Sequence, residues 1–268
     1  MKYMTFNSSC SYAGVANMLE CYGVNVEDRQ IALGMKLPYL FSREDSIYCS
    51  GPMLQSAEWF NLYLKPRGFF MTETKLFKEE VCLFLRETRP AMLGLGVSAG
   101  GKHAVVYTEA EGDRFRFLNN KHKSSPDPEV IYLTQEELLS LLSDSVSVAV
   151  LQEGLPTPVD LRPYFQESAD ILLQLKRDIK AFCSRQQTPQ SFRAARDTLF
   201  RAILLDGITM LELLGNEEPL QTLKSVQKEF LAALKENKSL VPADRLSLNR
   251  LECAIDAYRE LVLSHSFK

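Results

Sequence analysis

The chain has 268 residues, a length typical of two domains or of one large domain. Its residues are 46% hydrophobic and 24% charged, and this balance excludes disordered, collagen-like and disulfide-dense chains. The formal net charge of −3 provides no general basic field, so we expect no nucleic-acid partner.

The first residues contain no apolar stretch of the kind found in a signal peptide. The polar run Asn7-Ser8-Ser9 follows Phe6 closely, whereas a signal peptide needs an apolar core of about 7–15 residues. The chain also lacks the run of roughly 18 apolar residues that a membrane span requires. We therefore expect a cytoplasmic protein with no membrane partner.

The first part of the chain predicts helices followed by strands. A helix is expected from about Cys10 to Tyr22, ending at Gly23, because apolar residues recur along one side and glycine is typical just beyond a helix end. Helices first and an antiparallel sheet afterwards predict an α+β fold. The further expected segments are short helices near 27–36, 51–64 and 76–88, and strands at Ala91–Val97, His103–Thr108, Arg114–Leu118 and Val146–Leu151.

The composition of the chain changes near residue 155. Eleven of the 13 glycines precede this point, and the sequence Gly154-Leu155-Pro156 is typical of a loop. We expect residues 1–154 to form one domain and residues 155–268 to form an all-α helical bundle. Its four helices are predicted near 160–184, 189–214, 217–237 and 242–264.

Cys10 is the cysteine whose position favours a chemical role. It follows the helix-capping residue types of positions 7–9 and begins the first predicted helix. A thiol there lies near unpaired N–H groups and the positive end of the helix dipole, which favour the thiolate. The same N–H groups stabilise a developing oxyanion. The alternative is a buried cysteine that only packs at the helix start.

His103 and Asn119 are the candidate partners of Cys10. A three-residue turn at 110–112 places His103 directly opposite Asn119 on the neighbouring strand. A carboxamide there accepts a ring N–H and fixes the imidazole tautomer, leaving the other ring nitrogen for a thiol. A two-residue turn would present Asn120 instead. A core histidine satisfied by an asparagine is the alternative without catalysis.

Most of the cysteines are expected to be reduced and buried, packing as small hydrophobic residues. The chain has no CxxC pair and only three histidines, so neither a metal site nor a cofactor is predicted. The five cysteines without a predicted role are Cys21, Cys49, Cys82, Cys183 and Cys253.

The residues around the three candidates resemble papain-like bacterial cysteine enzymes. The run SCSYAGVANML at 9–19 is similar to their nucleophile helix, and GKHAVV at 101–106 and FLNN at 117–120 are similar to their histidine and Asp/Asn strands. The similar groups are the bacteriocin-leader-processing peptidases and the butirosin-biosynthesis protein H family, acyltransferases in which a helical domain follows. The resemblance covers roughly residues 5–151 and implies a papain-like cysteine-protease fold.

The chain departs from this family pattern at several positions. Ser11 replaces the glycine that usually follows the nucleophile, and Asn119-Asn120 replaces an aspartate followed by proline. Met4 stands where the family carries an oxyanion-hole glutamine, and Asn7 is the nearest amide substitute. Because losing one oxyanion donor costs about 10²–10³ in rate, a substitute donor or a changed reaction is implied.

Together these residues predict acyl transfer through a thioester on Cys10. His103 would act as the base, Asn119 would orient the imidazole, and the Cys10 amide with Asn7 would hold the oxyanion. The expected substrate is a peptide, an amide or an acyl thioester, the last presented by a carrier protein. The acceptor is water in a peptidase or amidase and an amine in an acyltransferase. A non-catalytic binding module is the competing hypothesis, and the helical region would cover the cleft, bind a carrier or form a homodimer.

Overall fold

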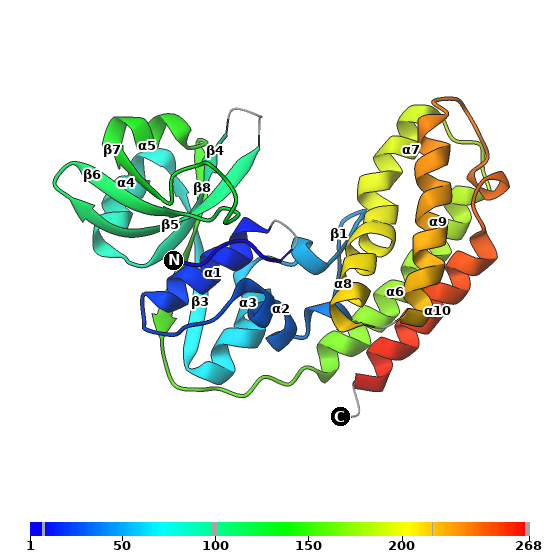
Figure 1. The fold of residues 1–268 in the computed structure, drawn as a ribbon, viewed down its shortest axis with the longest axis horizontal. Coiled ribbons are helices and arrows are strands. Elements are labelled where there is room, and N and C mark those ends of the chain that lie inside the picture. The colour runs from blue at the N-terminus through cyan, green and yellow to red at the C-terminus, as the bar shows by residue number, and fades with distance from the viewer. Residues whose placement is uncertain (7–8, 98–100, 216, 266–268) are drawn as a thin grey trace. The chain divides into compact units, whose positions relative to one another are not determined.

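The computed structural model describes residues 1–6, 9–97, 101–215 and 217–265 (Figure 1). Contacts along the chain divide it into two compact units. The first unit comprises Met1–Met35 and Gln55–Val159, and the second comprises Lys36–Leu54 and Asp160–Lys268. Within the described ranges, no helix combines the length and the apolar character needed to cross a membrane.

The first unit contains a six-stranded sheet in which all neighbouring strands are antiparallel. The strand order is β3-β8-β4-β5-β6-β7. Because helices precede and flank this sheet, the predicted α+β class is confirmed. The strands are β3 (Phe69–Phe77), β4 (Ala91–Gly96), β5 (Lys102–Glu111), β6 (Arg114–Asn119), β7 (Val130–Thr134) and β8 (Ser145–Glu153).

Helices cover both faces of the sheet. On one face, the buried side chains of Leu93, Val105 and Phe117 share a core with α4 and α5. On the other face lies α1, where Gly14 faces Met92: a side chain at Gly14 would overlap the Met92 sulfur, so glycine permits the close approach of α1. The helices of this unit are α1 (Cys10–Glu20), α2 (Asp28–Gly34), α3 (Ala57–Leu64), α4 (Lys78–Glu87) and α5 (Gln135–Leu141).

The second unit consists of a helical bundle and a two-stranded β-hairpin. The hairpin packs on the helices, since the Phe41 N–H donates to Ser168 Oγ at 2.9 Å and the Ser50 hydroxyl donates to Ala202 O at 2.7 Å. The elements of this unit are β1 (Phe41–Glu44), β2 (Ile47–Ser50), α6 (Arg162–Cys183), α7 (Pro189–Ala195), α8 (Gly207–Leu214), α9 (Glu217–Lys235) and α10 (Leu248–His265).

These contacts correct the predicted division into residues 1–154 and 155–268. The hairpin segment 36–54 belongs to the second unit although it precedes most of the sheet. The crossing point also lies beyond residue 154, because the Gly154 N–H donates to Gly68 O at 2.8 Å and holds that stretch to the first unit. The change in composition near residue 155 therefore lies close to only one of the points at which the chain passes from one unit to the other.

The predicted helices and strands differ from the structure mainly where local pattern is weak. The strand Phe69–Phe77 was not predicted, because four of its nine residues, Thr72–Lys75, form a polar and charged middle with little apolar alternation. The helix expected at 189–214 contains two π-helical stretches, at 196–200 and 202–206, between α7 and α8. The last helix begins at Leu248 rather than at residue 242, since Pro242–Asp244 forms a separate short 3-10 turn.

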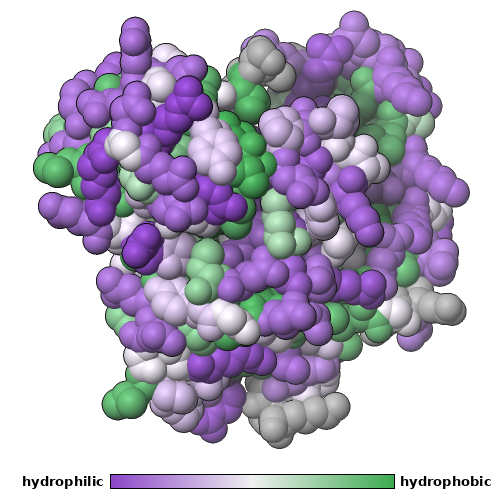
Figure 2. All heavy atoms as spheres, turned by 60° about the vertical axis from the view of Figure 1, so that its left-hand side comes forward, coloured by the Kyte–Doolittle hydropathy of each residue, from purple (hydrophilic) through white to green (hydrophobic). Residues whose placement is uncertain are grey.

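The face of the molecule drawn in Figure 2 is mainly hydrophilic, with hydrophobic side chains in small groups. Phe77 and Leu83 are the large apolar side chains of the α4 region that are exposed, at 68% and 65%. Single exposed apolar side chains are normal on a folded protein, and these two indicate no particular partner.

Candidate active site

Cys10 is the first residue of α1, as the sequence predicts. The preceding residue, Ser9, is extended, and its N–H donates to Phe6 O at 3.0 Å. The thiol is partly exposed, and the Ala104 N–H of strand β5 donates to its sulfur at 3.3 Å. The thiol therefore lies between the start of a helix and the start of a strand, with a backbone donor directed at it.

The residues before the nucleophile are held by Asp28, the first residue of α2. Its buried carboxylate accepts hydrogen bonds from the N–H groups of Thr5 at 2.6 Å and Phe6 at 2.8 Å, and from the Thr5 hydroxyl. The Met4 N–H donates to Lys121 O at 2.8 Å, which fixes the same segment from the other side. Asn7, the predicted oxyanion donor, lies outside the described residues.

His103 contacts Asn119, which orients its imidazole ring. His103 Nε2 lies 2.7 Å from Asn119 Oδ1, and Asn119 Nδ2 donates to Pro128 O at 2.9 Å. Because the Pro128 carbonyl only accepts, the amide nitrogen faces it and the amide oxygen faces the ring. Nε2 therefore carries the proton that bonds to Asn119, and Nδ1 is left for Cys10.

The strand register that produces this contact differs from the predicted one. The turn between β5 and β6 has two residues, Gly112 and Asp113, and β5 contains a β-bulge between Tyr107 and Glu109. As a result Val105, and not His103, lies directly opposite Asn119. The histidine is the diagonal neighbour on the same strand face, which is still within reach of its long side chain.

Hydrogen bonds shift the pKa values of Cys10 and His103 in opposite directions. Burial raises the Cys10 pKa, but the hydrogen bond with His103, the Ala104 N–H and the charge of His103 together bring it below its ordinary value of 9.0. The His103 pKa is raised above 6.5 mainly by its hydrogen bond with Cys10, with burial opposing and Asn119 and the charge of Asp127 contributing. Both shifts favour a thiolate–imidazolium pair, in which the two groups titrate together.

Asn120 lies next to Asn119 but has different partners. It is fully buried, and its Nδ2 donates to Ala104 O at 3.0 Å while its Oδ1 accepts from Asn17 Nδ2 at 2.8 Å. The sequence left open whether Asn119 or Asn120 contacts the imidazole, and in the structure Asn119 makes this contact. Asn17 was not predicted, although an asparagine on the apolar side of a helix is itself a signal of a buried polar contact.

The other cysteines are free thiols in two kinds of environment. Three are buried, in agreement with the expectation that most of these thiols are buried, and two are exposed. Exposed Cys21 caps the C-terminal end of α1, and desolvation of its sulfur together with the charge of Glu20 raises its pKa. The buried thiols are Cys49, Cys82 and Cys183, and the second exposed thiol is Cys253.

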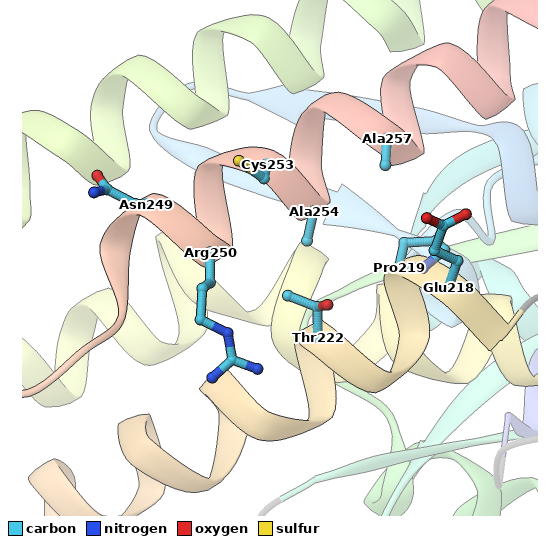
Figure 3. Close-up of a pocket in the computed structure, with 8 residues that line it drawn as sticks. All are labelled: Glu218, Pro219, Thr222, Asn249, Arg250, Cys253, Ala254 and Ala257. Atoms are coloured by element: carbon cyan, nitrogen blue, oxygen red, sulfur yellow. The ribbon is translucent and has the colours of Figure 1, made fainter.

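A separate hollow of about 320 Å³ lies between α9 and α10 in the second unit (Figure 3). Thr222 of α9 and Arg250 and Cys253 of α10 are among the residues that line it. Among the described residues of this lining there is no histidine, so the thiol of Cys253 has no base of the kind that Cys10 has. In the described ranges, no group of three or more His, Cys, Asp or Glu side chains is arranged to hold a metal ion.

Comparison with known proteins adds a structural similarity. No family model matches the chain, and no curated protein matches it. Among solved structures, the peptidase domain of Streptococcus ComA, a bi-functional ABC transporter involved in a quorum-sensing pathway, is 14% identical with a TM-score of 0.38. The match covers 56% of this chain and 96% of that one. At these values the similarity assigns neither a family nor an activity.

Proposed function

We propose that the chain is a papain-like cysteine enzyme that acts on an amide or a thioester through an acyl intermediate on Cys10. The observation that carries the proposal is that strand β5 brings two consecutive residues to the site: the Ala104 N–H donates to the Cys10 sulfur at 3.3 Å, and His103 is hydrogen-bonded to Asn119 at 2.7 Å. The interaction of Cys10 with His103, which lowers the pKa of the thiol and raises that of the imidazole, supports the same assignment. A nucleophile, a base and a group that orients the base form the arrangement that activates a catalytic thiol.

The acylation half of the reaction uses the ion pair. The Cys10 thiolate attacks the carbonyl carbon of the substrate, and the carbonyl oxygen takes the negative charge. N–H groups in the first turn of α1, including that of Cys10, are the donors that favour this oxyanion. As the intermediate collapses, the C–N or C–S bond of the substrate breaks and His103 gives its Nδ1 proton to the leaving atom. The acyl group remains on sulfur as a thioester.

Deacylation restores the starting state. Neutral His103 accepts a proton from water or from an amine as that molecule attacks the thioester carbonyl. The bond to the Cys10 sulfur then breaks, and Cys10 leaves as a thiolate beside the newly protonated imidazole. With water the product is a carboxylic acid, as in a peptidase or amidase; with an amine it is an amide, as in an acyltransferase.

Selective alkylation tests the activated thiol. The intact chain is treated with limiting iodoacetamide at about pH 6, and each cysteine peptide is quantified by mass spectrometry. Because alkylation follows the thiolate fraction, we expect Cys10 to react at least about tenfold faster than exposed Cys21, whose pKa is shifted upward. Equal rates at the two cysteines would contradict the proposal.

The pH profile of the same reaction has a defined direction. The Cys10 pKa is lowered, so its alkylation rate should rise and level off below the pH at which an ordinary thiol with a pKa of 9.0 does so. The His103 pKa is raised, so the imidazolium partner is lost only as the pH rises through a value above 6.5. Turnover, which needs both charged groups, should follow a bell between these two limits.

An acyl thioester probe separates the reaction types. The chain is incubated with an N-acetylcysteamine thioester, with and without an added primary amine, and the products are identified. Release of acid alone assigns a hydrolase, and an amide formed in proportion to the amine assigns an acyltransferase. If a reactive Cys10 gives neither an acyl adduct nor turnover with peptide, amide and thioester probes, the chain is a binding module and the proposal fails.

A further inference from the structure

Two buried amides connect the helix that carries Cys10 to the strand that carries His103. Asn17 in α1 and Asn120, just after β6, are both 0% exposed. Asn17 Nδ2 donates to Asn120 Oδ1 at 2.8 Å, and Asn17 also pairs with the Lys2 backbone through N–H and C=O bonds of 2.6 and 3.1 Å. Because buried amides are costly when unsatisfied, these bonds specify one arrangement of the elements that they join.

The second amide ends at the residue that contacts the nucleophile. Asn120 Nδ2 donates to the Ala104 carbonyl at 3.0 Å, and the Ala104 N–H donates to Cys10 Sγ at 3.3 Å. Asn17 and Cys10 belong to the same helix, so the contacts form a closed ring from α1 through both amides to β5 and back to the thiol. A displacement of Ala104 would change the hydrogen bond to the sulfur directly.

Packing leaves the Asn120 amide little freedom. A Cβ atom at Gly14, one turn after Cys10, would lie 2.8 Å from Asn120 Nδ2 and closer still to the Met92 sulfur. The amide therefore occupies the space that the glycine leaves between helix and sheet. Its position is set by packing as well as by its two hydrogen bonds.

We propose that Asn120 is a positioning residue that holds the Ala104 N–H against the Cys10 sulfur by bridging β5 to Asn17. This inference rests on the proposed function, since it requires Cys10 to be the nucleophile. In this arrangement Asn119 orients the imidazole of His103, and Asn120 positions the N–H of Ala104. A side chain without a hydrogen-bond donor at position 120 could not make the bond to the Ala104 carbonyl.

The test compares two isosteric substitutions in the full-length chain. Asn120→Leu removes the bridge to Ala104, and Asn61→Leu removes a matched bridge between α3 and β3. In the matched bridge, Asn61 Nδ2 donates to Met71 O at 2.9 Å and Asn61 Oδ1 accepts from Met71 N at 2.7 Å. The pKa of Cys10 is read from the pH dependence of its alkylation, and thermal unfolding reports the stability of each variant.

We expect Asn120→Leu to raise the Cys10 pKa by about one unit, the size expected for a lost hydrogen bond to a charged group. Asn61→Leu should lower the unfolding temperature without moving this pKa, because its partners do not touch the thiol. If Asn120→Leu does not fold, the Cys10 pKa is measured in Asn120→Ser instead. The same rise is expected there, because the serine side chain is too short to bridge Ala104 and Asn17.

The outcomes separate the inference from the proposed function. A wild-type Cys10 that reacts no faster than Cys21 overturns the function itself. A reactive wild-type thiol whose pKa is unchanged in the Asn120 variant overturns only the inference. Equal pKa shifts in the Asn120 and Asn61 variants would reflect general loosening of the unit and would also overturn it.

Discussion

The two ends of α1 each carry a thiol, and the two thiols have opposite chemistry. Cys10 begins the helix, where it accepts a hydrogen bond from the Ala104 N–H and contacts His103. Cys21 caps the other end, where its thiol donates to Asn17 O at 3.4 Å and the charge of Glu20 acts more strongly on it than the opposing charge of Arg116. The pKa is lowered at the first end and raised at the second.

The comparison shows which physical effects lower the pKa of one thiol and raise that of the other. Desolvation is the largest single effect at both cysteines, and it raises both pKa values. The difference comes from the neighbours: a cationic imidazole and a backbone donor at Cys10, a carboxylate at Cys21. The helix dipole acts in the same direction as these neighbours but is available at every helix end. Specific partners, more than helix position, therefore set the directions of the two pKa shifts.

Replacing the imidazole should make the two ends alike. In His103→Ala, desolvation still raises the Cys10 pKa while its strongest opposing contact is gone, so this pKa should rise toward that of Cys21. Turnover should fall by about 10²–10⁴, the usual contribution of a general base. Steady-state rates and alkylation at about pH 6 measure both effects, with the unchanged Cys21 peptide as the internal reference. If Cys10 still reacted faster than Cys21 without His103, the imidazole would not be the cause of the difference between the two thiols.

The sequence was sufficient to single out residues that the structure brings together, but not the geometry that joins them. Cys10, His103 and Asn119 were singled out by helix-start position, strand pattern and spacing. The predicted register was wrong because a two-residue turn and a β-bulge each shift the pairing, and the two shifts are not visible in residue types. The contact with Asn119 survives because a diagonal neighbour is also within reach.

Long-range contacts account for what the sequence did not predict. The Ala104 N–H is a backbone group, which carries no residue-type signal, and the Asn17–Asn120 pair joins positions far apart in the chain. The hairpin at 41–50 was missed for the same reason, since its partners are in helices more than a hundred residues later. Local periodicity predicts elements, but it does not show which element each one packs against.

Substitution at Asn119 should have a smaller effect than loss of the histidine. Asn119→Leu leaves His103 in place but removes the acceptor of its Nε2 proton, so the ring is no longer held toward Cys10. We expect kcat to fall by about 10–10², the range typical of a misplaced catalytic group. Asn119→Asp retains an acceptor and adds a negative charge, which should raise the His103 pKa and move the alkaline limb of the pH profile upward. A profile that moves to lower pH would contradict this role for position 119.

A change at the far end of α1 should leave the site unaffected and reduce only the stability. Gly23 follows the helix with a φ of +76°, and a Cβ built there meets no atom within 4 Å, so Gly23→Ala introduces backbone strain without a clash. The free energy of unfolding should fall by about 1 kcal/mol, the usual cost of a side chain in this conformation. Denaturant unfolding measures this loss, and alkylation should show an unchanged Cys10 rate. If Gly23→Ala instead slowed Cys10 as much as Asn119→Leu does, reactivity would depend on the helix as a whole. The contrast between its two ends would then not reside in the contacts of His103 and Ala104.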